Sequence, residues 1–441
     1  MKTPLTLHNL WHQRFKTAVS IGGVAFALLL VFMQLGFMGA VSHTATNLLD
    51  KLQFDVLLRA RDYLHLYEAG LIDQRSLHVA RNTPGVRSAH PMWITIQNWK
   101  TMPTQAQQLS GDFRGQYLPI AVMGYQPEQP VFDLPEVEEA RELLLKGDAM
   151  LLDNSTQVDY GPWESQALFP LLPWTTGRFG EADIGRQTEV GGRLFTVGGL
   201  YTLGTGLAAN GALITGQRGF ARVAPWDTNQ RVSLGLIRLE SDDPAEQARV
   251  VEQLKQRLSL QSESRTSQRV VETTQPAQLE NSEQSTSESS GSDTIVSIVT
   301  RAEALAAERY RWLWQTPFGL IFQMGVVLSL VVGASIVYMV LATDVANRMS
   351  EYATLLAMGY SRLFLASIVM TQAIVLSLLG FGVAWGVAEL LYRVTYRVSG
   401  IPLMMDAQRI LLVAALGVVM CCLSGLLALR KLWKAEPANL F

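Results

Sequence analysis

The sequence predicts an α-helical membrane protein with four transmembrane helices and a large α+β domain between the first two of them. Charged residues make up only 17% of the 441-residue chain, below the roughly 25% of average globular proteins. They are nearly absent from four windows, and each window supplies the ~20 apolar residues that a membrane-spanning helix needs. Between the first two windows, strand-like and helical stretches are mixed, as in α+β domains.

The four windows set the predicted membrane spans. We expect transmembrane helices at 18–41, 312–343, 363–388 and 410–429, with a short periplasmic loop at 389–409. Thr3-Pro4 is a favourable helix start, and the apolar residues that follow it at helical spacing predict an amphipathic interfacial helix at 1–17. The first window is much longer than the core of a signal peptide, which is about 7–15 residues, so we expect it to remain uncleaved.

Basic residues predict the orientation. Lysine and arginine gather before the first window, between the second and third, and after the fourth: Lys2, Arg14, Lys16, Arg348, Arg362, Arg430, Lys431 and Lys434. These segments share one side of a four-helix chain, and such residues favour the cytoplasm. We therefore expect both termini, including the tail at 430–441, in the cytoplasm of a bacterial inner membrane, with a periplasmic domain at 42–311. Three arginines on the other side, Arg393, Arg397 and Arg409, weaken the signal.

The periplasmic domain shows its elements as local patterns. We expect strands at 54–60, 86–99 and 117–125, a helix at 75–81, and a strand–turn–strand unit in "GALITGQRGFARV" (211–223). The segment 260–293 is rich in Ser, Thr, Gln and Glu. It holds too few apolar residues to offset its ordering entropy, so we expect a disordered insertion there.

Familiar catalytic and cofactor motifs are absent from the sequence. There is no G-x-x-x-x-G-K-[ST], no G-x-S-x-G and no H-E-x-x-H. The two cysteines, Cys421 and Cys422, are neighbours inside the fourth window, and the net charge of −2 does not favour nucleic acid. We therefore expect a non-catalytic subunit without cofactor or metal, although a dispersed active site is not ruled out by the lack of motifs.

Small residues spaced four apart occur in the predicted membrane helices. Gly36 and Ala40 form one pair, and Gly382 and Gly386 form another. Such pairs let helix backbones approach closely, so we expect all four residues at helix contacts, and packing within one protomer is the simpler interpretation. Glu389, at the outer end of the third window, is interpreted as an interfacial residue rather than a proton carrier.

The connector between the second and third windows is patterned like a helix. Its residues Glu351, Leu355, Met358 and Arg362 follow the spacing i, i+4, i+7 and i+11, which would place them on one side of a helix. Gly359 is a favourable helix stop. The pattern indicates an amphipathic helix at 344–362 that would suit the groove of a cytoplasmic partner; taken alone, the pattern leaves an ordinary surface loop as the simpler interpretation.

Several segments of this chain resemble the FtsX-like/MacB-type permease superfamily, and most closely its DevC-type branch. The stretch "EYATLLAMGYS" (351–361) is similar to the superfamily motif after its second helix. The segments "GLAANGALITGQRGFAR" (206–222), "VSLGLIRLE" (232–240) and "MCCLSGLLALRKLWKAEPANLF" (420–441) resemble the DevC-type branch. The insertion at 260–293 departs from this pattern because it is longer and lower in complexity.

The resemblance implies the permease subunit of an ATP-driven ABC export complex. It implies a homodimer, a separate ABC ATPase that binds the ATP, a periplasmic membrane-fusion adaptor, an outer-membrane TolC-like channel, and a hydrophobic or lipid-like cargo. The segment 344–362 is then the coupling helix, and Arg348, Glu351 and Gly359 match its motif most directly. An alternative is a mechanotransmission subunit that regulates a periplasmic partner, such as a cell-wall hydrolase, without moving cargo.

Overall fold

The structure is a computed structural model of the 441-residue chain. It describes residues 14–103, 115–161, 165–169, 172–175, 179–204, 209–273, 296–347, 349, 351, 354–355, 358–399 and 401–434. The described residues form two compact units, one from 1–43 with 312–441 and the other from 44–311. The amphipathic helix expected at 1–17 lies almost entirely outside the described residues.

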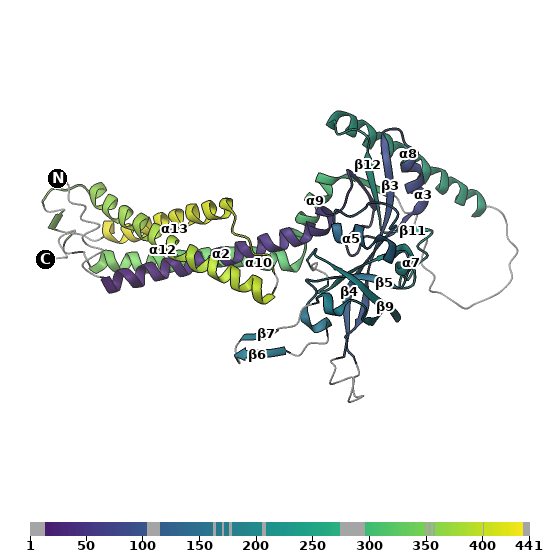
Figure 1. Ribbon diagram of the computed structural model, residues 1–441. Helices are drawn as coiled ribbons and strands as arrows, with labels where there is room; N and C mark the ends of the chain where they lie inside the picture. Colours follow the sequence, from purple (N-terminus) through teal and green to yellow (C-terminus); the bar gives the residue numbers. More distant parts are fainter. Residues whose placement is uncertain are drawn as a thin grey trace, which may run out of the picture. The chain divides into compact units, whose positions relative to one another are not determined.

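Four long helices form the first unit (Figure 1): α2 (Arg14–Asp50), α10 (Pro317–Asn347), α12 (Arg362–Ser399) and α13 (Ala407–Lys434). Each contains a segment long and apolar enough to cross a membrane. The four helices therefore agree with the predicted number of spans. Their ends differ from the predicted ones, because hydrogen bonding continues each helix beyond its apolar stretch.

Helix α2 is the helix that the other three share. Glycines on α10, α12 and α13 approach it closely: Gly333 lies against Ala27, Gly380 against Val24, and Gly417 against Leu28. These side chains belong to one apolar cluster whose members on α2 are almost fully buried. A hydrogen bond of 3.0 Å from the Ser424 hydroxyl to the Ala334 carbonyl joins α13 to α10. The packing therefore uses the close approach that small residues permit.

The second unit is built on a nine-stranded mixed sheet with the order β13-β1-β12-β3-β4-β10-β5-β9-β8. Its strands are β1 (Val56–Ala60), β3 (Val86–Lys100), β4 (Tyr117–Tyr125), β5 (Ala149–Asp153), β8 (Gln187–Val190), β9 (Arg193–Tyr201), β10 (Ala212–Gly216), β12 (Leu234–Leu239) and β13 (Val296–Thr300). Two short pairs stand apart from it, β2 (Ile72–Asp73) with β11 (Arg231–Val232) and β6 (Ser165–Phe169) with β7 (Leu172–Thr175).

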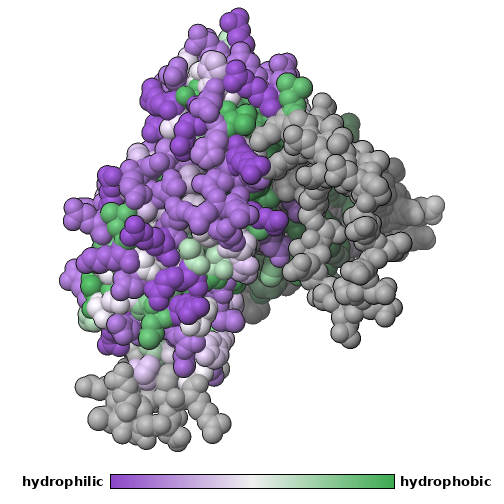
Figure 2. All heavy atoms as spheres, turned by 90° about the vertical axis from the view of Figure 1, so that its right-hand side faces the viewer, coloured by the Kyte–Doolittle hydropathy of each residue, from purple (hydrophilic) through white to green (hydrophobic). Residues whose placement is uncertain are grey.

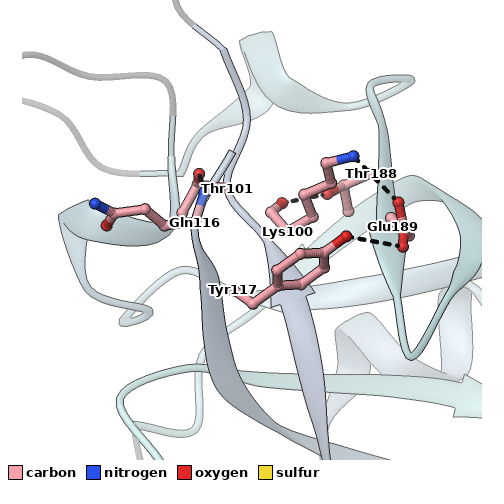
Figure 3. Close-up of polar contacts among 6 residues, drawn as sticks. All are labelled: Lys100, Thr101, Gln116, Tyr117, Thr188 and Glu189. Atoms are coloured by element: carbon pink, nitrogen blue, oxygen red, sulfur yellow. Dashed lines mark hydrogen bonds and ion pairs between the residues drawn. The ribbon is translucent and has the colours of Figure 1, made fainter. Parts of the chain in front are cut away.

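Strand β3 closes part of the sheet on itself, because its far end also pairs with β8 at Trp99 and Val190. Figure 3 shows the polar contacts there: the Thr188 hydroxyl donates to the Lys100 carbonyl over 2.8 Å, and the Lys100 ammonium lies 3.4 Å from the Glu189 carboxylate. The Tyr117 hydroxyl, at the start of β4, also donates to Glu189. These contacts satisfy the polar groups where the closed part of the sheet ends.

Helices cover both faces of the sheet: α3 (Gln74–Arg81), α5 (Pro135–Glu139), α6 (Arg141–Leu144), α7 (Gln217–Ala221), α8 (Pro244–Thr273) and α9 (Arg301–Tyr310). One core contains Leu77 of α3 and Leu254 of α8. The core on the other face contains Val137 of α5 and Ala304 of α9. The face of the second unit in Figure 2 is mostly hydrophilic, with hydrophobic side chains in small groups.

Three predicted boundaries differ from the structure. The segment 217–221, expected to lie in a strand–turn–strand unit, is the helix α7, because Phe220 is buried between Trp93 and Trp226. Residues 260–273 continue helix α8 instead of being disordered, while 274–295 lie outside the described residues. The expected loop at 389–409 is shorter, because α12 runs to Ser399.

Candidate functional site: the connector between α10 and α12

The connector begins where α10 ends at Asn347. Glu351, Thr354 and Leu355 are helical, and the Met358 amide donates to the Thr354 carbonyl over 3.0 Å. A helical segment therefore lies between the two membrane helices, as the sequence predicts. Arg348 lies outside the described residues, so its predicted docking role stays a prediction.

Gly359 ends this helical segment. Its φ of +92° is in the left-handed region that favours glycine. The amide of Tyr360, one residue later, donates over 3.1 Å to the carbonyl of Leu355. A glycine in this conformation followed by a hydrogen bond five residues back is the Schellman termination of a helix. The predicted helix stop therefore has a defined geometry in the structure.

Helix α12 starts almost at once. The Ser361 side chain accepts a hydrogen bond of 3.2 Å from the Phe364 amide, which is the geometry of an N-cap. The ring of Tyr360 stacks on that of Phe364 with centroids 5.0 Å apart. The connector helix is thus joined to α12 by two residues, Tyr360 and Ser361, that are held by a hydrogen bond and a ring contact.

Leu355 holds the connector onto the membrane helices. It packs, half-buried, against a cluster formed by Val345 of α10 and Leu365 and Val369 of α12, and these three side chains are at most 3% exposed. Leu355 therefore does not share the exposed surface with Glu351, although the sequence spacing places them on one side. Its position instead makes it the contact that ties the connector to α10 and α12.

The exposed surface of the connector combines one acid with apolar side chains. Glu351 is exposed; Met358 is 63% exposed, Tyr360 47% and Leu363 79%. The sequence pattern did not predict a role for Tyr360 or Leu363, because the last apolar residue of the predicted face was Met358, just before Gly359. Arg362 begins α12 beyond that glycine, so it is not on the same helix as Glu351, contrary to the spacing argument.

The four predicted packing residues fall into two groups. A side chain added at Gly36 would overlap the ring and hydroxyl of Tyr392, and Ala40 is buried in a cluster with Tyr392. Side chains added at Gly382 or Gly386 would meet none of the chain's own described atoms within 4 Å. The first pair lies at a contact between α2 and α12, while the second pair faces away from the helices of its own chain.

The described residues contain no group of three or more histidine, cysteine, aspartate or glutamate side chains that could hold a metal ion. The outer histidines His65 and His90 each have a pKa lowered chiefly by burial, which favours their neutral form. Cys421 and Cys422 are free. His65 lies beside Glu68, with 3.8 Å between its Nε2 and a carboxylate oxygen.

Comparison with known proteins places the connector inside a recognised domain. Residues 324–437 match the FtsX-like permease C-terminal family. No curated protein matches the chain. Two solved structures are similar to its α+β domain. The extracellular domain of the noncanonic ABC-type transporter YknZ from Gram-positive bacteria shares 10% identity, covering 46% of this chain and 92% of its own, with a TM-score of 0.27. The periplasmic region of MacB from Actinobacillus actinomycetemcomitans shares 9% identity, covering 58% and 92%, with a TM-score of 0.32.

Proposed function

Because its C-terminal helices carry the FtsX-like permease domain, we propose that this chain is the transmembrane subunit of an ATP-driven ABC export complex. Permeases of this kind typically work with a separate ATPase. In this proposal the ATPase docks on the connector beneath the inner membrane, with both termini of the chain in the cytoplasm. The permease is a homodimer that passes the ATPase motion through its helices to the α+β domain in the periplasm.

The geometry of the connector is the observation that carries this proposal. Glu351 and Met358 are exposed on a short helix that packs on α10 and α12 through the half-buried Leu355. Apolar side chains next to a charge suit the groove of a partner protein. Only Tyr360 and Ser361 lie between the glycine that ends the connector helix and the start of α12. In this proposal, a partner that moves the connector helix therefore also moves α12.

The proposed mechanism is mechanotransmission rather than carriage of ions through the bilayer. The stretch 363–388 of α12 contains no Asp, Glu, Lys, Arg or His, and a proton-driven pump would require such groups near the bilayer centre. The α+β domain would engage a periplasmic membrane-fusion adaptor leading to a TolC-like channel. The apolar surfaces of the helices suit a lipid-like or other hydrophobic cargo of the kind that DevC-type permeases export.

The docking role is tested by co-purification of the ATPase partner from the native cells, identified by mass spectrometry. Glu351→Lys reverses the charge on the exposed surface, and Gly359→Val places a β-branched residue at a φ of +92°. We expect both variants to insert into the membrane normally but to retain less than about a tenth of the ATPase, which corresponds to a loss of roughly 1.4 kcal/mol in binding free energy.

A matched control separates docking from a general effect of charge. Asp406 is also an exposed acid, and it lies on the other connector, between α12 and α13. Asp406→Lys should therefore retain the ATPase like the unmodified chain. Full ATPase recovery by both connector variants would contradict the docking role.

Export and pure regulation of a periplasmic partner make different predictions for cells that lack the permease. An exporter predicts that a hydrophobic compound accumulates in the cell or its inner membrane. A regulator of a cell-wall hydrolase predicts a defect in cell separation with no accumulated compound. Lipid extracts compared between the deletion strain and the complemented strain distinguish the two.

A further inference from the structure

Helix α12 is longer than a bilayer requires, and its excess carries arginines. The helix has 38 residues and is therefore about 57 Å long, whereas the hydrocarbon core is about 30 Å thick. Its uncharged stretch ends at Ala388, and the helix then continues to Ser399 through Glu389, Arg393 and Arg397. This last part extends beyond the apolar span, at the end of α12 opposite to the connector.

Arg409, the third arginine near this end, has structural partners. Its guanidinium lies over the ring of Tyr392 at 5.9 Å and donates a hydrogen bond to the Met404 carbonyl. A side chain added at Gly39 would collide with the Arg409 guanidinium. Tyr392 is itself anchored by a hydrogen bond from its hydroxyl to the Phe32 carbonyl. These contacts therefore give the Arg409 side chain a structural role within the helix bundle.

Arg393 and Arg397, which we call the arginine pair, lack such an explanation. They are four residues apart on α12, so they lie on the same side of the helix, and both are exposed. Arg393 forms an ion pair with Glu389, at 2.9 Å and 3.0 Å from two of its nitrogens to one carboxylate oxygen. No carboxylate among the described residues forms an ion pair with Arg397. Exposed guanidinium groups beyond the end of an apolar span have N–H donors available to an anionic ligand.

Aromatic side chains accompany the arginine pair along the helix. Trp385 is 46% exposed and Tyr396 is 58% exposed. They are eleven residues apart, close to three helical turns, so they project in nearly the same direction. Tryptophan and tyrosine with this exposure are typical of the membrane–water interface, where one end of the ring system is apolar and the other is wet.

We propose that the arginine pair binds the anionic headgroup of a membrane amphiphile, with Tyr396 at the level of the headgroup and Trp385 against the apolar part. Guanidinium groups bind phosphate or carboxylate through paired N–H donors and are weakly hydrated, which suits the interface. Glu389 occupies Arg393 when no ligand is bound and gives it up to an incoming headgroup. The position on the outer half of the membrane rests on the proposed function, which sets the orientation; the binding itself does not.

The test measures lipid retained by the purified full-length permease. The chain is extracted in a mild detergent, incubated with equal amounts of phosphatidylglycerol and phosphatidylcholine, and analysed by native mass spectrometry. We expect the unmodified chain to retain phosphatidylglycerol over phosphatidylcholine, and R393A/R397A to retain at least about fivefold less phosphatidylglycerol. R393K/R397K keeps the charge but loses the paired donors, and should give an intermediate value.

Two controls make the result specific. R75A/R249A removes the same charge from two exposed arginines of the α+β domain and should leave retention unchanged. Glu389→Gln frees Arg393 and should increase retention. Equal retention by all arginine variants, or an equal loss in R75A/R249A, would overturn the proposal. Displacement of the lipid by millimolar inorganic phosphate alone would also overturn the proposal, because the site would then recognise the free anion and not the amphiphile.

The experiment is independent of the ATPase. If the connector variants failed to release the ATPase, the proposed function would be weakened while the lipid measurements stood. Conversely, unchanged lipid retention in R393A/R397A would remove the headgroup site and leave the docking proposal intact.

Discussion

The hydroxyl of Tyr63 donates a hydrogen bond to the carboxylate of Glu308, joining the loop after β1 to helix α9 inside the α+β domain. Glu308 is 1% exposed, and a carboxylate so buried is stable only when it is hydrogen-bonded or paired. Burial, reinforced by the charge of Glu308, raises the pKa of Tyr63 well above its usual value. The tyrosine therefore keeps the proton that it donates.

A second buried carboxylate, Asp153, lies at the end of β5 and faces Tyr201 of β9 in the sheet register. It is 0% exposed, and its Oδ1 accepts a hydrogen bond of 2.8 Å from the Ser155 amide. Its Oδ2 has no hydrogen-bond partner among the described residues. Burial raises the pKa of Tyr67, and the negative charges of Asp153 and Glu308 raise it further. Tyr67 therefore interacts electrostatically with both carboxylates.

Removal of the Tyr63 hydroxyl should destabilise the protein. Tyr63→Phe removes one hydrogen-bond donor from the buried Glu308 carboxylate, at a cost of about 1–3 kcal/mol. We expect the thermal midpoint of the full-length chain in detergent to fall by several degrees. Tyr310→Phe is the matched control, because Tyr310 ends the same helix and is 58% exposed. Equal midpoints for the two variants would show that the buried hydrogen bond contributes nothing.

Asp153 should make stability depend on pH. Burial raises its pKa from 3.8 to about 6, against the opposing effect of the hydrogen bonds from Ser155. The folded state therefore holds this proton more tightly than the unfolded chain. The resulting stability is complete below about pH 4, falls as pH rises from about 4 to 6, and is lost above, a difference of about 3 kcal/mol.

Asp153→Asn tests this dependence because it removes the titration and keeps the shape. The thermal midpoint of Asp153→Asn should exceed that of the unmodified chain at pH 7.5, and the difference should shrink towards pH 4.5. Asp159 lies six residues later and is exposed. The thermal midpoint of Asp159→Asn should equal that of the unmodified chain at every pH. A constant difference between Asp153→Asn and the unmodified chain would contradict the raised pKa.

Gly36 and Gly382 should tolerate a larger side chain very differently. Gly36→Val would force Tyr392 from its position against α2, and overpacking of this kind costs about 1–3 kcal/mol. A Cβ added at Gly382 meets none of the described atoms within 4 Å, and valine has a slightly higher helix propensity than glycine, so Gly382→Val should cost little. Thermal midpoints in detergent compare the two directly, and a drop as large at Gly382 as at Gly36 would contradict the packing described above.

The far end of α8 should be dispensable, while its near end should not. Deletion of 262–292 removes the polar end of the helix and the segment beyond it but keeps Leu254 and Leu258, which are buried in the core. We expect the thermal midpoint of the deletion variant to stay within about 2 °C of the unmodified chain. Leu254→Ala, at a residue 0% exposed, should instead cost about 2–5 kcal/mol. A large drop in the deletion variant would show that the segment is structural.

Local pattern was enough to predict most elements of this protein. The four apolar stretches, the strand at 117–125 and the helix stop at Gly359 appear where the sequence places them. Each depends on interactions within a few residues of the chain: apolar length, alternation, or a glycine that accepts a positive φ. The FtsX-like permease resemblance, read from 351–361, is confirmed by the family match, while the DevC-type branch stays a prediction.

What the sequence by itself determined is therefore the number and type of elements and the presence of a helix between two membrane spans. Only the tertiary structure decided which of two similar small-residue pairs meets another helix, that Leu355 is half-buried while Glu351 is exposed, and that Asp153 and Glu308 are both buried. The reason is physical: these properties depend on contacts between residues far apart in the chain, such as Tyr63 and Glu308, separated by 245 positions, or Phe32 and Tyr392, separated by 360. No local periodicity records which distant surfaces will meet.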